Sequence, residues 1–112
     1  MAKGNHLGEF EHLVMLALLR LGTDAYGMRV RQVIQSRTER SVSIGSVYAT
    51  LDRLERKGYV LSSIGEADPS AGGRARRYFS LTPEGGAALL RKQDAIQRMT
   101  EGISVRRELE AL

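Results

Sequence analysis

The sequence has 112 residues, a formal net charge of +4 and no cysteine. This length suits one domain with a modest core, and the missing cysteine excludes disulfides, thiolate metal sites and cysteine nucleophiles. No apolar run approaches the ~20 residues of a membrane span, and the N-terminus has no apolar stretch of signal-peptide length, so we expect a cytoplasmic protein whose basic surface suits a polyanionic partner.

Two amphipathic helices are predicted in the first third of the chain. Over residues 8–21 the apolar side chains recur at helical spacing, and Gly22 offers a natural stop. Asp24 is the expected N-cap of a second helix over residues 25–36, because its carboxylate can accept a bond from a free backbone N–H.

A third helix is predicted over residues 44–57, with Ser43 as its N-cap and Gly58 as its end. Its apolar side chains recur at helical spacing, so one face should be buried: Ile44, Val47, Tyr48, Leu51 and Leu54. The opposite, polar face is then free for other contacts.

A β-hairpin is predicted after the third helix. Residues 59–66 and 74–81 have the pattern of short strands, and the residues between them are rich in turn formers, including Gly72 and Gly73. Because side chains alternate along a strand, the second strand should place Arg77, Phe79 and Leu81 on one side and Arg76, Tyr78 and Ser80 on the other.

A last helix is predicted from Pro83 towards the C-terminus, with Thr82 as its N-cap. Gly102 is a weak point at which this helix can continue, bend or end. Four apolar residues along it suggest a seam for a second copy of the chain, and the alternative is a helix that packs only on its own domain: Leu89, Ile96, Met99 and Ile103.

The predicted order of elements is that of a winged helix-turn-helix domain. The fold class is therefore mainly α with a small β-hairpin, in which the third helix reads a DNA groove and the hairpin is the wing. Residues 1–81 would form the DNA-binding domain, and residues 82–112 a C-terminal dimerisation helix.

The polar face of the third helix is the candidate DNA-reading surface. Small side chains early in a helix let its backbone approach base edges, while hydroxyls and arginines bond to bases or phosphates, and a helix start attracts phosphate. The alternative is a face that meets only water. The candidate residues are Ser43, Ser46, Ala49, Thr50 and Arg53, with Lys57 further along the same face.

The wing arginines and one tyrosine complete the candidate DNA contacts. Arg74 and Arg76 are expected to reach phosphate or the minor groove, and Arg77 to be shared with the domain surface. Tyr48 has two interpretations, since its ring belongs to the apolar face while its hydroxyl could reach a phosphate.

Three segments together resemble the PadR family of bacterial transcriptional regulators, over residues 8–90: LALLRLGTDAYGMRV, SIGSVYATLDRLERKGYV and GGRARRYFSLTPEG. The resemblance implies a homodimeric repressor of the short type, often released by a small molecule. It also implies that Tyr48 and the polar face of the third helix meet DNA, and that the arginines after Gly73 form the wing contact. Ala49 stands where many family members have a proline.

Two other classes of function have less support in the sequence. A winged-helix module that binds only proteins is the alternative, but it would favour an acidic or apolar third helix. An enzyme has no support, because His6 and His12 share no helical face and no phosphate-binding loop is present. Asp52 and Glu55 are explained by salt bridges with Arg53 or Arg56 on the same helix. We therefore expect no catalytic residues, no metal and no cofactor.

Overall fold

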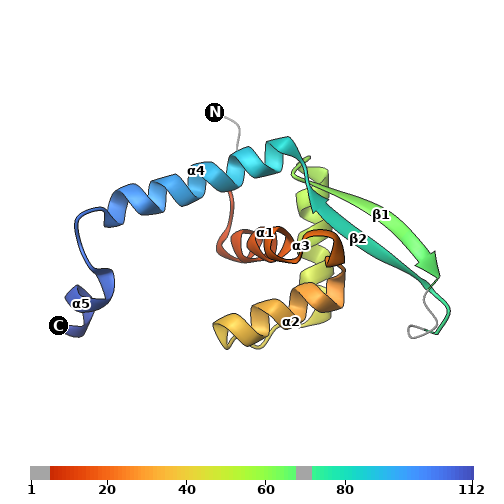
Figure 1. The fold of residues 1–112 in the computed structure, drawn as a ribbon, viewed down its shortest axis with the longest axis horizontal. Coiled ribbons are helices and arrows are strands. Elements are labelled where there is room, and N and C mark those ends of the chain that lie inside the picture. Colours follow the sequence, from red (N-terminus) through yellow and green to blue (C-terminus); the bar gives the residue numbers. More distant parts are fainter. Residues whose placement is uncertain (1–5, 68–71) are drawn as a thin grey trace.

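The computed structural model describes residues 6–67 and 72–112 of the chain. The fold is mainly helical with one antiparallel hairpin, and it has the predicted winged helix-turn-helix order (Figure 1). The tip of the predicted hairpin, residues 68–71, lies outside the described residues. The elements are α1 Glu9–Leu21, the short 3-10 helix η2 Gly22–Asp24, α2 Gly27–Thr38, α3 Ile44–Arg56, β1 Val60–Ala67, β2 Ala75–Leu81, α4 Pro83–Thr100 and α5 Val105–Glu110.

The core lies where α1, α2 and α3 meet and where the hairpin covers them. Each of these helices buries the apolar stripe that its spacing predicts. Fully buried side chains come from all three helices and from β1, which fixes their relative positions: Val14, Met15, Val30, Val47, Leu51, Leu54 and Val60.

The hairpin is tied to the helices by its second strand. The backbone N–H of Phe79 donates to the carbonyl of Ala25 at 2.8 Å, and Tyr26 forms an isolated antiparallel bridge with Tyr78. The predicted alternation along β2 is confirmed, because Phe79 is buried and Arg77 stacks on it, whereas Tyr78 meets Tyr26 on the other side.

The start of α2 differs from the prediction. Asp24 was expected to cap this helix, but the N-cap is Tyr26, without a side-chain cap bond. Asp24 instead ends η2, and its carboxylate accepts a bond from Arg29 at 3.1 Å. The extra 3-10 turn moves the helix start by two residues, because Ala25 and Tyr26 are used for the contacts with β2.

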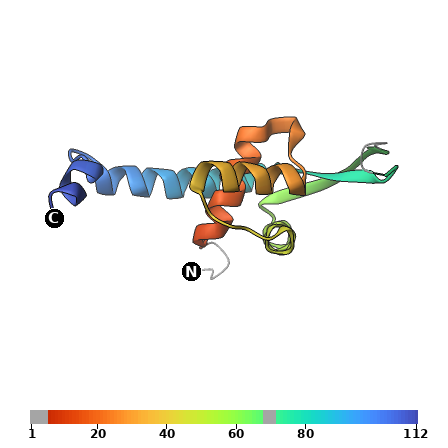
Figure 2. The ribbon, with the colours of Figure 1, turned by 90° about the horizontal axis from the view of Figure 1, so that it is seen from below.

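Helix α4 begins on the domain and then leaves it. Thr82 is its N-cap, as predicted, and accepts a bond from the backbone of Gly85 at 2.9 Å. The second half of the helix extends as an arm, on the opposite side of the domain from the wing (Figures 1 and 2). No helix within the described part of the chain is both long and apolar enough to cross a membrane.

The C-terminal segment consists of two helices, so among the outcomes that the sequence leaves open at Gly102 the structure shows that the helix ends there. Helix α4 ends at Thr100, and α5 starts only at Val105. Gly102 between them has φ of 81°, a conformation that glycine adopts without steric cost. The weak point in the sequence is therefore a break, and α5 turns back at the end of the arm (Figure 1).

Candidate nucleic-acid interface

Helix α3 presents an exposed face, here called the α3 outer face. It is small in its first half and cationic in its second: Gly45, Ser46, Ala49, Arg53 and Arg56. A Cβ built on Gly45 would meet no atom within 4 Å, so this end of the helix faces open space. The backbone of α3 can therefore come close to a binding partner at this end.

Thr50 differs from its predicted position. It was expected on the exposed polar face, but it is only 3% exposed. Its hydroxyl accepts a bond of 3.4 Å from Arg53 Nη2, so it supports that side chain from below. Thr50 lies on the border of the buried stripe, where helical spacing alone does not decide burial.

Ser43 caps α3, as predicted. Its hydroxyl accepts a bond from the backbone N–H of Ser46 at 3.0 Å and donates to the Ser46 hydroxyl at 2.8 Å. The Ser46 hydroxyl accepts in this pair, and it forms no hydrogen bond with any other described residue. One exposed hydroxyl donor thus remains at the helix start, where the helix dipole favours anions.

Arg53 and Lys57 share one carboxylate, that of Glu11 on α1. Arg53 Nε lies 3.0 Å from Glu11 Oε2, and Lys57 Nζ lies 2.9 Å from the same atom. The side chain of Arg53 is still 47% exposed, whereas that of Lys57 is 20% exposed. Arg53 therefore remains available on the α3 outer face, and Lys57 acts mainly within the fold.

The Glu11 carboxylate is buried and remains charged. Burial alone would raise the pKa of Glu11, but bonds from the Gly8 backbone N–H, Lys57 and Arg53 together hold that pKa below its ordinary value. The same carboxylate joins the N-terminus of α1 to the second half of α3. This contact fixes the tilt of α3 against the domain.

Arg77 joins the wing to α3. Its guanidinium donates to Asp52 Oδ1 at 3.1 Å and to Glu55 Oε1 at 2.7 Å, and it stacks on the ring of Phe79. Asp52 and Glu55 are thus paired across to the wing, not within α3 as the sequence suggested. Arg77 is shared with the domain surface, as expected, and it neutralises two acidic side chains beside the α3 outer face.

A cleft opens between α2, α3 and the wing. The guanidinium of Arg76 lies over the ring of Tyr26, 4.2 Å from its centre, and Tyr78 meets the same ring edge-on. Arg74 is exposed at the outer end of the cleft. Four of the predicted contact residues, Tyr48, Arg74, Arg76 and Arg77, therefore line this cleft. The full lining consists of Tyr26, Met28, Gln32, Tyr48 and residues 74–77.

Tyr48 takes part in both the core and this cleft. Its ring is half-buried and packs against Phe79. It also lies directly on Gly27 at the start of α2, where any added Cβ would overlap the ring. The two interpretations of Tyr48 are thus compatible, because packing holds the ring while its edge lines the cleft.

No group of three acidic or histidine side chains that could hold a metal ion is found in residues 6–67 and 72–112. His12 instead bonds to Gln93 at 2.8 Å, which links α1 to α4. The chemistry of the site is that of hydroxyl and guanidinium donors, which suits phosphates and base edges.

Comparison with known proteins identifies the chain. Residues 15–91 match the family described as "Transcriptional regulator PadR-like family", which covers more than half of the sequence. The chain belongs to the PadR family. Its fold is the winged helix-turn-helix fold of this family of transcriptional regulators.

Three solved structures, two of them of PadR-family proteins, share the fold. A PadR-like transcription factor from Bacteroides fragilis is 25% identical with a TM-score of 0.69, over 82% of this chain and 84% of that one. A PadR family transcription regulator from Clostridium difficile is 26% identical with a TM-score of 0.65, over 83% and 95%. RosR from H. salinarum, at 24% identity, shares the fold with a TM-score of 0.70, over 94% and 87%.

A curated relative is also described as a transcriptional regulator. Transcriptional regulator Rv3488 from Mycobacterium tuberculosis is 39% identical over 62 residues. The matched segment spans 55% of this PadR-family chain and 54% of that relative, so it covers about half the length of each.

Sequence reasoning missed three residues of the interface. Gly45 and Arg56 lie directly opposite the buried stripe of α3, so the centre of that stripe would have located them. Glu11 carried no usable signal, because its partners are more than 40 residues away in the chain.

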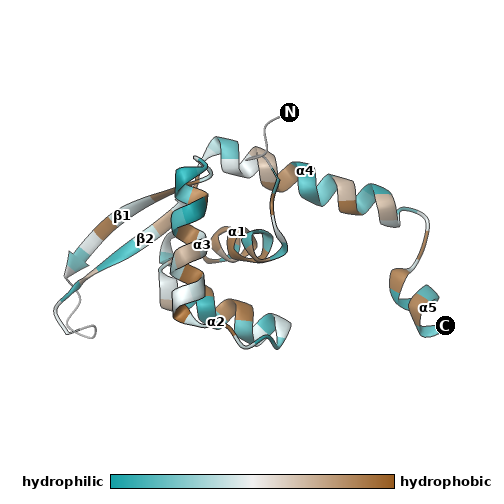
Figure 3. Cartoon of the chain, turned by 180° about the vertical axis from the view of Figure 1, so that it is seen from behind, coloured by the Kyte–Doolittle hydropathy of each residue, from teal (hydrophilic) through white to brown (hydrophobic). Residues whose placement is uncertain are grey.

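The predicted dimerisation residues fall into two groups. Leu89 is only 5% exposed and packs on its own domain, so it differs from the prediction. Ile96, Met99 and Ile103 are exposed, and Ile103 lies beyond the end of α4. Figure 3 shows apolar segments recurring along the arm and on α5. The exposed members of the predicted seam therefore all lie beyond the part of α4 that packs on its own domain.

Proposed function

We propose that the chain is a cytoplasmic repressor that binds a palindromic operator as a homodimer and is released by a small molecule. The observation that carries the DNA-binding part is the α3 outer face beside the arginines of the wing. The other parts have separate support and separate tests.

The α3 outer face suits the major groove. Gly45, Ser46 and Ala49 leave the start of the helix without bulky side chains, so its backbone can approach base edges. Arg53 and Arg56 follow on the same face and can donate to guanine or to phosphate. Thr50 is buried and is withdrawn from the proposed base contacts.

The wing suits the neighbouring phosphates. Arg74 is exposed and Arg76 is held over Tyr26, so both cations line the cleft next to α3. Arg77 acts differently, since its two ion pairs with α3 position the wing. We assign backbone contacts to Arg74, Arg76 and Tyr48, which set register and affinity but not sequence preference.

Two copies of the chain suit a palindromic site. The arm of α4 leaves its own domain with Ile96 and Met99 exposed, which favours cover by a second copy. A two-fold dimer would place two α3 helices on half-sites about one DNA turn apart, roughly 34 Å.

Repression and release by a small molecule are carried over from the family resemblance of the sequence. A reporter gene under the chain's own upstream region tests the repression. Deletion of the regulator should raise expression if it is a repressor, and lowered expression would identify an activator.

DNA binding is tested by fluorescence anisotropy on duplexes from that upstream region and on shuffled duplexes of equal composition. We expect about 10³-fold tighter binding to the operator, and a steep loss of affinity with salt. Equal affinity for both duplexes, or none at low salt, would overturn the proposal and favour a protein-binding module.

A matched pair of variants locates the interface. Arg56→Ala should weaken operator binding by about tenfold, whereas Arg98→Ala should leave it unchanged. Both residues are exposed helical arginines with no hydrogen bond or ion pair to another described residue. Similar losses in both variants would mean that general positive charge, not the α3 outer face, binds the DNA.

A further inference from the structure

A hollow of about 470 Å³ lies between α1 and α2, away from the α3 outer face. We call it the α1–α2 groove. Its volume falls in the range of small-molecule sites, roughly 300–1,000 Å³. Leucines of α1 and Val33 of α2 form most of its apolar lining, and two arginines, Arg20 and Arg37, complete it.

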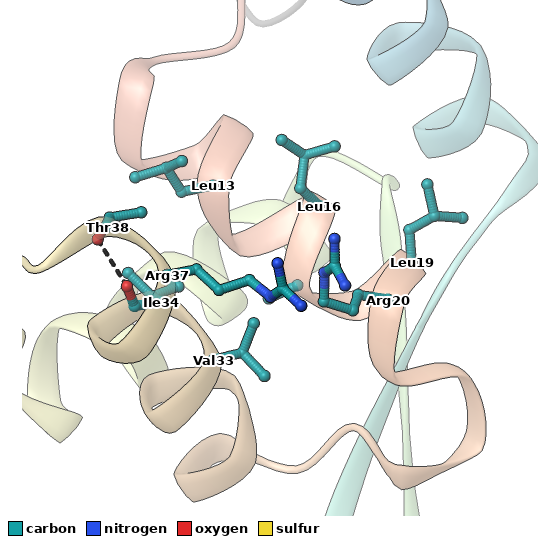
Figure 4. Close-up of a pocket in the computed structure, with 9 residues that line it drawn as sticks. Leu13, Leu16, Leu19, Arg20, Val33, Ile34, Arg37 and Thr38 are labelled. Carbon is teal, nitrogen blue, oxygen red and sulfur yellow. Dashed lines mark hydrogen bonds between the residues drawn. The ribbon is translucent and has the colours of Figure 1, made fainter.

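The two arginines lie beside this apolar lining, one on each helix. Figure 4 shows the side chains of Arg20 and Arg37, one from each helix, directed towards one another across the groove. Neither guanidinium has a hydrogen bond or ion pair to any residue in the described part of the chain. Two like charges that line the same groove repel each other, and an anion bound between them offsets that repulsion.

Each arginine lies in the last turn of its helix, where a cation is favoured by the helix dipole. That preference explains a basic residue at each helix end. It does not explain why both side chains turn to the same apolar hollow, where no carboxylate meets them.

We propose that the α1–α2 groove binds an amphipathic anion, with an apolar aromatic or aliphatic body on the leucines and one acidic group between Arg20 and Arg37. Guanidinium groups bind carboxylate, sulfonate and phosphate oxygens in a paired geometry. The binding itself needs no DNA, and only a regulatory use of the site rests on the function proposed above.

The arm of a second copy is a poorer occupant by charge. Beyond Gln93, which bonds to His12 of α1, helix α4 carries one arginine, Arg98, and one carboxylate, Asp94. Helix α5 carries two arginines and two glutamates. Neither segment has the net negative charge that would neutralise Arg20 and Arg37.

The experiment uses the full chain without DNA and two fluorescent probes of similar apolar body. Anilinonaphthalene sulfonate is an anion, and N-phenylnaphthylamine is neutral. We expect Arg20→Gln/Arg37→Gln to weaken sulfonate binding by at least about tenfold, as for lost charge-assisted bonds, with little effect on the neutral probe. Decanoate should displace the sulfonate from the wild type.

Arg91→Gln/Arg98→Gln is the matched control, because it removes two exposed cations of α4 and should leave both affinities unchanged. Equal losses in the two double variants would overturn the proposal, as would no loss in either. Sedimentation decides the remaining case: if Arg20→Gln/Arg37→Gln changes the oligomeric state, the groove is a subunit interface and the proposal is wrong. Circular dichroism and the unfolding midpoint check that the variants fold.

The location is tested with single tryptophans, because the chain has none. Leu19 is exposed on the rim of the groove, and Ile64 is exposed on the wing. Energy transfer to bound anilinonaphthalene sulfonate should be stronger in Leu19→Trp than in Ile64→Trp. Equal or reversed transfer would place the probe elsewhere and overturn the proposal.

Discussion

Arg74 and Arg77 are close in sequence on the same wing, but their surroundings give them different work. Arg74 is exposed and lines the cleft beside α3. Arg77 holds Asp52 and Glu55 and stacks on Phe79. The first is free to meet a phosphate, whereas the second holds the wing at its angle to α3.

Substituting these two arginines should therefore separate stability from binding. Arg77→Ala should lower the free energy of unfolding by roughly 1 kcal/mol, since its ion pairs are partly exposed, and should weaken operator binding as well. Arg74→Ala should weaken binding without changing stability. Urea unfolding measures the stability, and fluorescence anisotropy measures the operator binding. An Arg77→Ala variant with the same free energy of unfolding as the wild type would contradict the positioning role.

Glu11 links the pH dependence of stability to α3. Its ordinary pKa is 4.5, and its pKa in the folded chain is lower. As pH falls, the unfolded chain therefore takes up this proton first. The stabilisation is complete above the unfolded value and is lost as pH falls through the folded value.

We expect Glu11→Gln to cost about 2 kcal/mol at neutral pH, because Arg53 and Lys57 lose their charged acceptor. From about pH 6 to about pH 3, its free energy of unfolding should fall less steeply than that of the wild type. Urea titrations across this range measure both slopes. Parallel slopes would show that Glu11 does not carry the linkage.

At the scale of elements, the start of α4 depends on one glycine. A Cβ at Gly85 would overlap the carbonyl oxygen of Tyr59, which is backbone and cannot move aside alone. Gly86, in the next position, has nothing within 4 Å of its Cβ direction. Both glycines lie in the first turn of α4, but a Cβ would clash at Gly85 and would face open space at Gly86.

Gly85→Ala should therefore destabilise the chain by about 2 kcal/mol or more, as overpacking of a buried site does. Gly86→Ala should be neutral or stabilising by about 0.5–1 kcal/mol, the helix propensity gained over glycine. Thermal unfolding of both variants measures the contrast. Equal midpoints would mean that α4 moves easily at its start.

The order of elements could be predicted from the sequence because periodicity, caps and glycines are local signals. Ser43 and Thr82 cap α3 and α4 as predicted, and Gly102 is where the last helix breaks. The cap of α2 could not be predicted, since Ala25 and Tyr26 are drawn into contacts with a strand some 50 residues later.

The finer make-up of the interface depends on tertiary contacts. Thr50 and Leu89 lie at borders between buried and exposed faces, so spacing alone did not decide their burial. The pairing of Arg77 with Asp52 and Glu55 joins a strand to a helix, and no local pattern in the sequence encodes it.

At the scale of the whole molecule, the chain is elongated, with extents of 53 × 34 × 21 Å. The arm carries α5, a helix of six residues without a buried side chain. A helix this short gains too little from its own hydrogen bonds to persist alone in water. Cover by a second chain would supply the missing packing.

The last prediction tests that cover. Ile96→Glu/Met99→Glu places two carboxylates on the uncovered side of α4, and burying them unpaired in a dimer is costly. We expect this variant to be a monomer by sedimentation, and to lose about 10²-fold or more in operator affinity, since one α3 helix then reads only one half-site.

Leu90→Glu is the control, because Leu90 is as exposed as a seam residue but points to the other side of the helix. It should remain a dimer with full affinity. A dimeric Ile96→Glu/Met99→Glu variant would move the interface away from the arm, and a monomeric variant with wild-type affinity would show that DNA binding does not depend on the second copy.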